Sequence, residues 1–227
     1  MTTHLFDNIA WHALTGDQAR FAAGDGAARR YARGFSPIVG FEDPSRPDFD
    51  ALRAIVEPGE AFYCDGWNGP SPPDFRLEAD TTMYKMVYAG AMPPADEAPD
   101  AVALGPAHLA QVLQLVDLTH PGPFGPRTIE LGDYFGVFDG ERLVAMAGER
   151  FRAGALHEIS GVCTHPDHQG RGLARRLMRK LMLRQMARGS VPVLHVIRDN
   201  ATARDLYLRM GFGIHAESPV RMARRID

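Results

Sequence analysis

The sequence predicts a mixed α/β fold, in which helices cover the faces of a sheet that is mainly antiparallel. Between residues 134 and 164, three strand-like runs are divided by the dipeptides Asp139-Gly140 and Ala153-Gly154, which favour hairpin turns. Between residues 172 and 225, helical and strand-like segments then alternate. An antiparallel meander that continues into β-α-β units is typical of a mixed sheet with helices on its faces.

The first part of the chain contains short elements. A helix is expected to begin near Pro47 and to end at Pro58-Gly59, with Leu52 among its apolar residues. Aromatic and β-favouring residues predict strands within 36–41, 60–65 and 83–88. Nothing in these segments points to a chemistry.

Two segments, 65–74 and 89–100, are rich in Gly, Pro and Asp and are interpreted as linkers. The second is also acidic and is expected to separate two structural units. We therefore expect an N-terminal α/β region over residues 1–95 and a second domain over residues 96–227.

The second domain carries clearer patterns. A strand within 101–105 leads into a helix over 107–118, where Leu109, Val112 and Val116 recur at helical spacing. After the hairpins come an arginine-rich helix over 172–188, a strand over 191–197, a helix over 201–210 and a strand over 220–225. Gly189 and Gly211 are expected to end the two helices.

Composition excludes several classes of protein. Of the 227 residues, 45% are hydrophobic and 23% are charged, which is ordinary for a soluble globular protein, and the net charge of -3 gives no sign of a polyanion-binding surface over the whole molecule. Cys64 and Cys163 make no disulfide framework in a chain of this length. No leader and no long apolar run is evident, so we expect a cytoplasmic protein without membrane contacts.

One stretch predicts an anion site: 158-EISGVCTHPDHQGRGLARRLM-178 passes from a strand through a glycine-rich bend into a helix. The first amides of a helix lack partners inside the helix and point outward along its dipole. Arg175 stands where a dinucleotide fingerprint requires its third glycine, and the Gly-Lys dipeptide of a nucleotide P-loop is absent. The anion is therefore of another kind.

The bend resembles a family signature. Gln169-x-x-Gly172-x-Ala174 is similar to the pyrophosphate-binding motif Q/R-x-x-G-x-G/A of the GCN5-related N-acetyltransferases. About thirty residues later, 200-NATARDLYLRMGF-212 resembles the family's second signature, N-x-x-A-x-x-x-Y-x-x-x-G-F. Two motifs in the correct order are far more specific than either alone. The resemblance covers residues 130–225 and is closest to the FR47-like branch, some members of which have a degenerate N-terminal half, to which residues 1–95 would correspond.

The resemblance implies a sheet that splits at its centre and binds acetyl-CoA as co-substrate. The acetyl or acyl group would pass directly to a primary amine of a small-molecule or peptide acceptor. The bend would cradle the pyrophosphate, the strand before it would pair with the pantetheine arm, and Gly161 would ease the distortion of that strand. The implied cofactor-binding residues are Val162, Cys163, Thr164, Gln169, Gly170, Arg171, Gly172, Leu173, Ala174 and Asn200.

Two residues are expected to catalyse the reaction. The resemblance places the Tyr207 hydroxyl near the thioester sulfur as general acid, although the helical spacing of Tyr207 is also that of a core residue. Glu158 is the first candidate for the base that deprotonates the amine, on the expectation that it shares a strand face with Val162 and Thr164, and Glu149 is the second. Either carboxylate could instead lie on the surface without a role.

Other residues have a simpler interpretation. Asn200 suits a helix N-cap as well as a cofactor contact. Cys163 is expected to be a buried, inert thiol, and no metal is expected at His165 and His168 because further ligands are lacking. The arginines of the 172–188 helix are expected to form a solvated face that binds no nucleic acid, apart from one or two in the first turn that would meet the 3′-phosphate of the cofactor.

Three questions stay open at this level. The rival functions are a non-catalytic domain that senses acyl-CoA and an RNA-associated protein that uses the basic helix. The acceptor is a small amine, an antibiotic, an amino acid, a peptide N-terminus or a protein lysine. A homodimer is compatible with the sequence.

Overall fold

The predicted hairpins form the middle of the sheet. The computed structural model describes residues 4–226. In it β7 (Tyr134–Asp139), β8 (Arg142–Ala153) and β9 (Leu156–Thr164) pair antiparallel in sequence order. The two turns contain Gly140 at φ 57° and Gly154 at φ 56°. Both glycines lie in the left-handed region that other residues rarely adopt, so the hairpins depend on them.

Within residues 4–226 the strands form an eleven-stranded mixed sheet in the order β1-β2-β3-β4-β11-β5-β10-β9-β8-β7-β6. The predicted mixed sheet is therefore confirmed. The remaining strands are β1 (Ala22–Ala23), β2 (Ala28–Tyr31), β3 (Ile38–Phe41), β4 (Ala61–Asp65), β5 (Phe75–Tyr88), β6 (Val102–Ala103), β10 (Val191–Ile197) and β11 (Phe212–Arg225). The helices are α1 (His4–Asp7), α2 (Ile9–Thr15), α3 (Phe49–Arg53), α4 (Leu109–Thr119), α5 (Leu173–Ala187) and α6 (Ala201–Met210).

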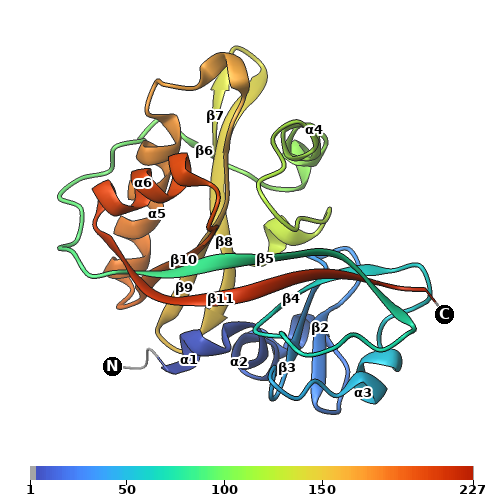
Figure 1. Cartoon of the computed structure of the whole chain (residues 1–227). Coiled ribbons are helices and arrows are strands. Elements are labelled where there is room, and N and C mark those ends of the chain that lie inside the picture. Colours follow the sequence, from blue (N-terminus) through green and yellow to red (C-terminus); the bar gives the residue numbers. More distant parts are fainter. Residues whose placement is uncertain (1–3, 227) are drawn as a thin grey trace.

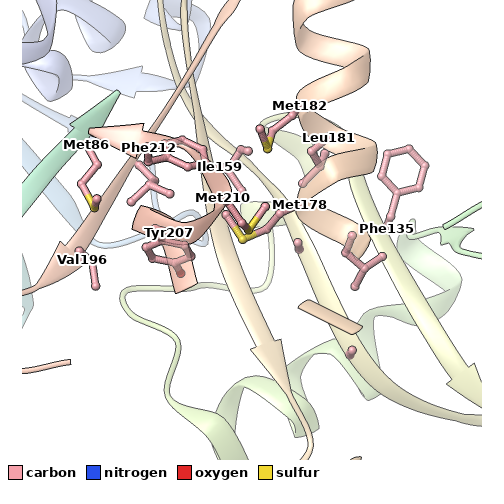
Figure 2. Close-up of a cluster of buried hydrophobic side chains, with 14 of the residues drawn as sticks. Met86, Phe135, Ile159, Met178, Leu181, Met182, Val196, Tyr207, Met210 and Phe212 are labelled. Carbon is pink, nitrogen blue, oxygen red and sulfur yellow. The ribbon is translucent and has the colours of Figure 1, made fainter. Parts of the chain in front are cut away.

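Helices cover both faces of the sheet, as the patterning predicts (Figure 1). On one face α5 packs over β7–β10 and α6 packs against β11, and Figure 2 shows apolar side chains of this cluster. On the other face α4 packs against β8 and β9, and α2 packs near β2, β3 and β8. Ile9, Ala10, Ala13 and Leu14 form the buried side of α2. Sequence patterns did not reveal this helix, nor the short strands β1 and β2.

The sheet splits between β9 and β10. The two strands run parallel, and their pairing ends at Val193 opposite Glu158, although β9 continues to Thr164 and β10 to Ile197. On its other side β9 stays paired with β8, with a register shift between Ser160 and Cys163. Gly161 lies inside that shift at φ 62°, so the distortion expected at this glycine is present. The predicted split at the centre of the sheet is confirmed.

The long central strand β5 lies between β10 and β11 and is antiparallel to both. The segment predicted over 83–88 is only its last part, and the strand predicted over 220–225 is likewise the end of β11. Strands on both sides of the 89–100 segment therefore belong to one sheet. The predicted helix near residues 47–58 is shorter than expected, because α3 begins after its N-cap Asp48 and ends at Arg53.

The acidic 89–100 segment packs against the basic face of α5. Arg176 forms an ion pair with Asp100 at 2.7 Å, Arg179 lies 3.2 Å from a Glu97 oxygen, and Lys180 pairs with Asp96. Arg184 near the end of α5 and Arg188, its C-cap, both contact Asp133. The helix charges that the sequence suggested would face solvent are therefore largely matched by carboxylates of the same chain. No helix within residues 4–226 is long and apolar enough to span a bilayer.

Candidate active site

A cleft of about 860 Å³ opens where β9 and β10 separate. One end is formed by the bend before α5 and by α6, and the other end extends over β4, β5 and β11 toward α2. The cleft brings together eleven of the predicted site residues: Glu158, Val162, Cys163, Thr164, Gln169, Gly170, Gly172, Leu173, Ala174, Asn200 and Tyr207. Arg171 is not among its lining residues, and its guanidinium lies 3.4 Å from Nδ1 of His168.

The bend before α5 presents a row of free backbone amides. Gly170 at φ 75° and Gly172 at φ 74° reverse the chain, and Gly172 is the N-cap of the fifteen-residue helix α5. Within residues 4–226 the amides of 170–174 donate to no carbonyl. A Cβ built on Gly170 would meet nothing within 4 Å, and one on Gly172 only Arg175 Nε at 3.9 Å. Backbone conformation and open space above the loop, rather than close packing, require glycine here.

The free edge of β9 forms one wall of the cleft. Val162 packs toward the apolar cluster of α5 and α6, whereas Cys163 faces the cluster of α4. Burial raises the pKa of the Cys163 thiol to about 11, so the thiol is protonated near neutral pH. This state fits the interpretation of Cys163 as a packing residue rather than a nucleophile.

Asn200, the N-cap of α6, and Tyr207, in the buried face of that helix, both line the cleft. Asn200 Oδ1 accepts a hydrogen bond from the Ala203 amide at 3.1 Å, so its predicted N-cap role is confirmed. The Tyr207 ring packs in the cluster that Figure 2 shows, 6.3 Å from the ring centroid of Phe212, and the residue also lines the cleft. Burial raises the pKa of Tyr207 to about 12. The phenol therefore keeps its proton at neutral pH and is able to donate it.

Glu158 lies at the point where the split begins and is 1% exposed. Its carboxylate accepts two hydrogen bonds from Arg150, at 2.7 and 2.9 Å, and a third contact joins Oε1 to Nδ1 of His195 at 2.7 Å. Burial alone would raise the pKa of this carboxyl, but Arg150 and then His195 outweigh it and lower the pKa to about 2. Glu158 is therefore ionised over the whole physiological range.

The expectation that Glu158 shares a strand face with Val162 and Thr164 is wrong. Val162 packs against the cluster under α5 and α6. The partner of Glu158, His195, instead contacts Phe6 at 5.1 Å in the cluster around α2 on the other face. The cause is the register shift in β9 at Gly161, which breaks the simple alternation of faces along the strand.

The second carboxylate considered, Glu149, lies outside the cleft lining. It is fully buried on the α5 side of β8, where it pairs with Arg152 at 2.6 Å and accepts a hydrogen bond from Gln185. Its contacts are those of a structural ion pair. Among residues 4–226 no group of His, Cys, Asp and Glu side chains is arranged to hold a metal ion.

His195 is a cleft residue that sequence patterns did not identify. It lies in the apolar run 191-VPVLHVI-197, and the only available signal was a single polar residue within a buried strand. Because β10 alternates its faces, His195 turns toward Glu158, while Val196 turns toward the α6 cluster.

The Glu158 ion pair is expected to make the fold sensitive to acid. Its pKa is about 2 in the folded protein against an ordinary 4.5, so folding favours the ionised form. That contribution is complete above the unfolded pKa and is lost as the pH falls through the folded one. Glu158→Gln removes it and leaves Arg150 buried without an anion, which costs about 3–5 kcal/mol near neutral pH.

Urea unfolding from about pH 6 to about pH 3 measures this effect. The difference in free energy of unfolding between the wild type and Glu158→Gln should shrink as the pH falls. A constant difference over that window would show that Glu158 has no depressed pKa in the folded protein.

Comparison with known proteins identifies relatives of this chain. Residues 134–220 match the family model described as FR47-like protein. A crystal structure from Novosphingobium aromaticivorans, assigned to the GNAT family of acetyltransferases, is 32% identical with a TM-score of 0.88, and the match covers 98% of this chain and 99% of that one. A GCN5-related N-acetyltransferase-like protein from Streptococcus suis shares the fold, at 16% identity and a TM-score of 0.62 over 95% and 92% of the two chains.

One curated relative matches over a shorter stretch. The N-alpha-acetyltransferase RimI of Mycobacterium tuberculosis is 40% identical over 83 residues. The match covers 35% of this chain and 51% of that protein, so the chain spans about half the length of this relative.

Proposed function

This chain belongs to the GCN5-related N-acetyltransferase superfamily and contains an FR47-like domain, and on that premise we propose that it transfers an acetyl group from acetyl-CoA directly to a primary amine. One observation carries the proposal. A single cleft connects the free amides before α5 with Tyr207 and Glu158 through the gap between β9 and β10. A long, bent ligand with a diphosphate at one end and a thioester at the other fits this arrangement.

Coenzyme A would bind along the cleft by backbone contacts. The amides of 170–174 would hold the diphosphate at the positive end of the α5 dipole. The unpaired edge of β9 from 159 to 164 would hydrogen-bond to the pantetheine arm as a neighbouring strand does. Arg175 lines the cleft with its side chain 48% exposed and 3.5 Å from Glu97, and it is our candidate for the 3′-phosphate contact.

The chemistry requires two proton transfers. An alkylammonium has a pKa near 10.4, so the acceptor must lose a proton before or during its attack on the thioester carbonyl. The departing coenzyme A thiolate then takes up a proton. We assign the second transfer to Tyr207, because its hydroxyl stays protonated at neutral pH and the residue borders the cleft.

Acetyl-CoA is expected to stabilise the folded protein. A ligand that binds only the native state adds about 2.7 kcal/mol at a hundredfold excess over its dissociation constant, which gives a readily visible rise in the melting temperature. Thermal unfolding with and without acetyl-CoA measures the effect, and dephospho-CoA serves as the matched control for the 3′-phosphate contact. Absence of any shift at millimolar acetyl-CoA, in a folded sample, contradicts the proposed function.

Turnover is distinguished from sensing by the release of free thiol from acetyl-CoA with a panel of amines. An enzyme releases thiol in proportion to a particular acceptor, whereas a domain that only senses acyl-CoA binds it without release. The panel should begin with peptides that have a free N-terminus, since the Mycobacterium tuberculosis relative is an N-alpha-acetyltransferase. Lysine side chains, amino acids and small amines complete it, and longer acyl-CoAs test the chain length.

A further inference from the structure

His195 has a buried ring nitrogen without a partner. Its Nδ1 lies 2.7 Å from Oε1 of Glu158, and an ionised carboxylate only accepts hydrogen bonds, so Nδ1 carries the hydrogen. Nε2 therefore holds the lone pair in the neutral ring. Within residues 4–226 this nitrogen is buried and has no hydrogen-bond partner. A buried acceptor without a donor costs free energy, and a donor from a bound molecule would remove that cost.

The side chains around His195 do not supply the donor. Phe6 and Phe151 pack their rings against the imidazole at 5.1 and 6.3 Å between centroids. Lys85 stands opposite His195 in the register of β5 and β10, but its ammonium contacts Asp65 at 2.6 Å and the Asp7 carbonyl at 2.6 Å. The imidazole thus lies between apolar rings and an ion pair that is already complete.

The position of His195 is where the acetyl group should arrive. The pairing of β9 with β10 ends at Val193 opposite Glu158, so His195 is the first residue beyond the vertex of the split on the face of Glu158. The diphosphate cradle follows the other end of β9. Residues 159–164 extend over about 20 Å at 3.3 Å per residue. A ligand that lies along this strand would therefore have its two ends about that far apart. Tyr207 lines the same cleft from the α6 side.

Glu158 itself has no free lone pair that suits a base. Oε1 accepts from Arg150 and from His195, and Oε2 accepts from Arg150 and from the Phe151 amide at 3.3 Å. Both oxygens are therefore engaged inside the protein, and the arginine holds the negative charge in place. The carboxylate is better placed to fix the tautomer and orientation of the imidazole than to receive a proton.

We propose that Nε2 of His195 accepts the proton of the acceptor amine and that Glu158 and Arg150 position the imidazole for this step. The inference rests on the proposed acetyl transfer. As the amine nitrogen bonds to the thioester carbon, its proton passes to Nε2. The carbon–sulfur bond breaks with its electron pair on sulfur, which takes a proton from Tyr207. The imidazolium then loses one proton and the phenolate regains one through water, so the products are the amide and coenzyme A with a free thiol.

His195→Asn tests the proposal. The asparagine amide keeps a donor for Glu158 but puts no basic nitrogen at the position of Nε2. We expect the acceptor-dependent turnover to fall by about 10²-fold near neutral pH, the lower end of what a general base contributes. The difference in turnover between His195→Asn and the wild type should become smaller as the pH rises. At high pH more of the acceptor is already the free amine, and water is able to take up the remaining proton. The acetyl-CoA thermal shift should match that of the wild type.

A matched control is His215→Asn. His215 also contacts Phe6, at 5.7 Å, but pairs with Asp7 and is not among the residues that line the cleft. Its replacement should leave turnover near the wild-type value. If His195→Asn fails to fold, His195→Gln replaces it in the same comparison.

Glu158→Gln separates the positioning role from a direct one. The glutamine oxygen still accepts from Nδ1, so turnover should fall less than in His195→Asn, but the kcat/KM profile should shift to lower pH because the negative charge that stabilises the protonated imidazole is gone. The charged and titratable groups near the imidazole, on the elements packed around it, are Glu158, Arg150, Lys85, Asp65, Asp7 and His215. A merely structural role for Glu158 would leave this profile unmoved.

The outcomes separate the two proposals. Wild-type turnover in His195→Asn, or a larger loss in folded Glu158→Gln than in His195→Asn, overturns the role of His195 and leaves the acetyl transfer standing. Failure of the wild-type protein to bind acetyl-CoA, or to release thiol with any amine, instead overturns the proposed function on which this inference rests.

Discussion

Replacing Tyr207 by phenylalanine is expected to lower turnover by about 10² to 10⁴, while the KM for acetyl-CoA changes little. The phenylalanine keeps the ring that packs against Phe212 and removes only the hydroxyl. That hydroxyl is needed when charge develops on the sulfur, so ground-state binding is spared. A coenzyme A thiolate is a fairly good leaving group, so the lower end of the range is expected.

Tyr84→Phe is the matched control for this variant. Tyr84 is 9% exposed and belongs to the same apolar cluster, but it is not among the residues that line the cleft. Its loss of a hydroxyl should leave turnover near the wild-type value. Wild-type turnover in Tyr207→Phe with the preferred acceptor would assign the proton donor to water or to another residue, without affecting the fold or the acetyl-CoA site.

Gly172→Asp is expected to weaken acetyl-CoA binding by about 10²-fold or more and to leave the protein folded. The new carboxylate would face the diphosphate, and two unit charges about 4 Å apart repel by about 4 kcal/mol at an effective dielectric constant of 20. Solvent at this exposed loop reduces that value. Gly172 lies at φ 74°, a conformation that aspartate tolerates better than most residues, so the bend itself should survive.

Gly189→Asp provides the control at the opposite end of the same helix. Gly189 has a similar φ of 79°, and a Cβ there would meet nothing within 4 Å, but it lies outside the cleft. The two variants therefore share the same backbone strain and the same added charge. Isothermal titration with acetyl-CoA should show weak binding only for Gly172→Asp. Equal affinity in both variants would mean that the glycines before α5 serve only the turn.

The features that sequence predicted well are local ones. The bend at 169–174 and the cap at Asn200 depend on glycine conformations and on hydrogen bonds between residues a few positions apart. Such features are determined by residues that lie close together in the sequence, and the two motifs place them on neighbouring strand-helix units. The hairpins of β7, β8 and β9 are local for the same reason.

The features that sequence could not predict depend on distant partners. His195 looks like an isolated polar residue in an apolar strand until Glu158 and Phe6 are brought beside it from other elements. The face of Glu158 was misassigned because a count of alternating residues does not contain the register shift at Gly161. The first part of β11 was likewise not predicted as a strand, because its residues are largely polar and its pairing with β5 cannot be read from the sequence.

The place of β5 in the sheet has a consequence for biosynthesis. Both neighbours of β5 follow much later in the chain, since β10 begins about 100 residues and β11 about 125 residues after the end of β5. A ribosome that adds about 5–20 residues per second leaves the two edges of this strand unpaired for roughly 5–25 s. Unpaired edges are where nascent chains associate with one another, so the chain is open to such association during this interval. Translation that stops before Phe212 releases a chain whose central strand keeps an open edge.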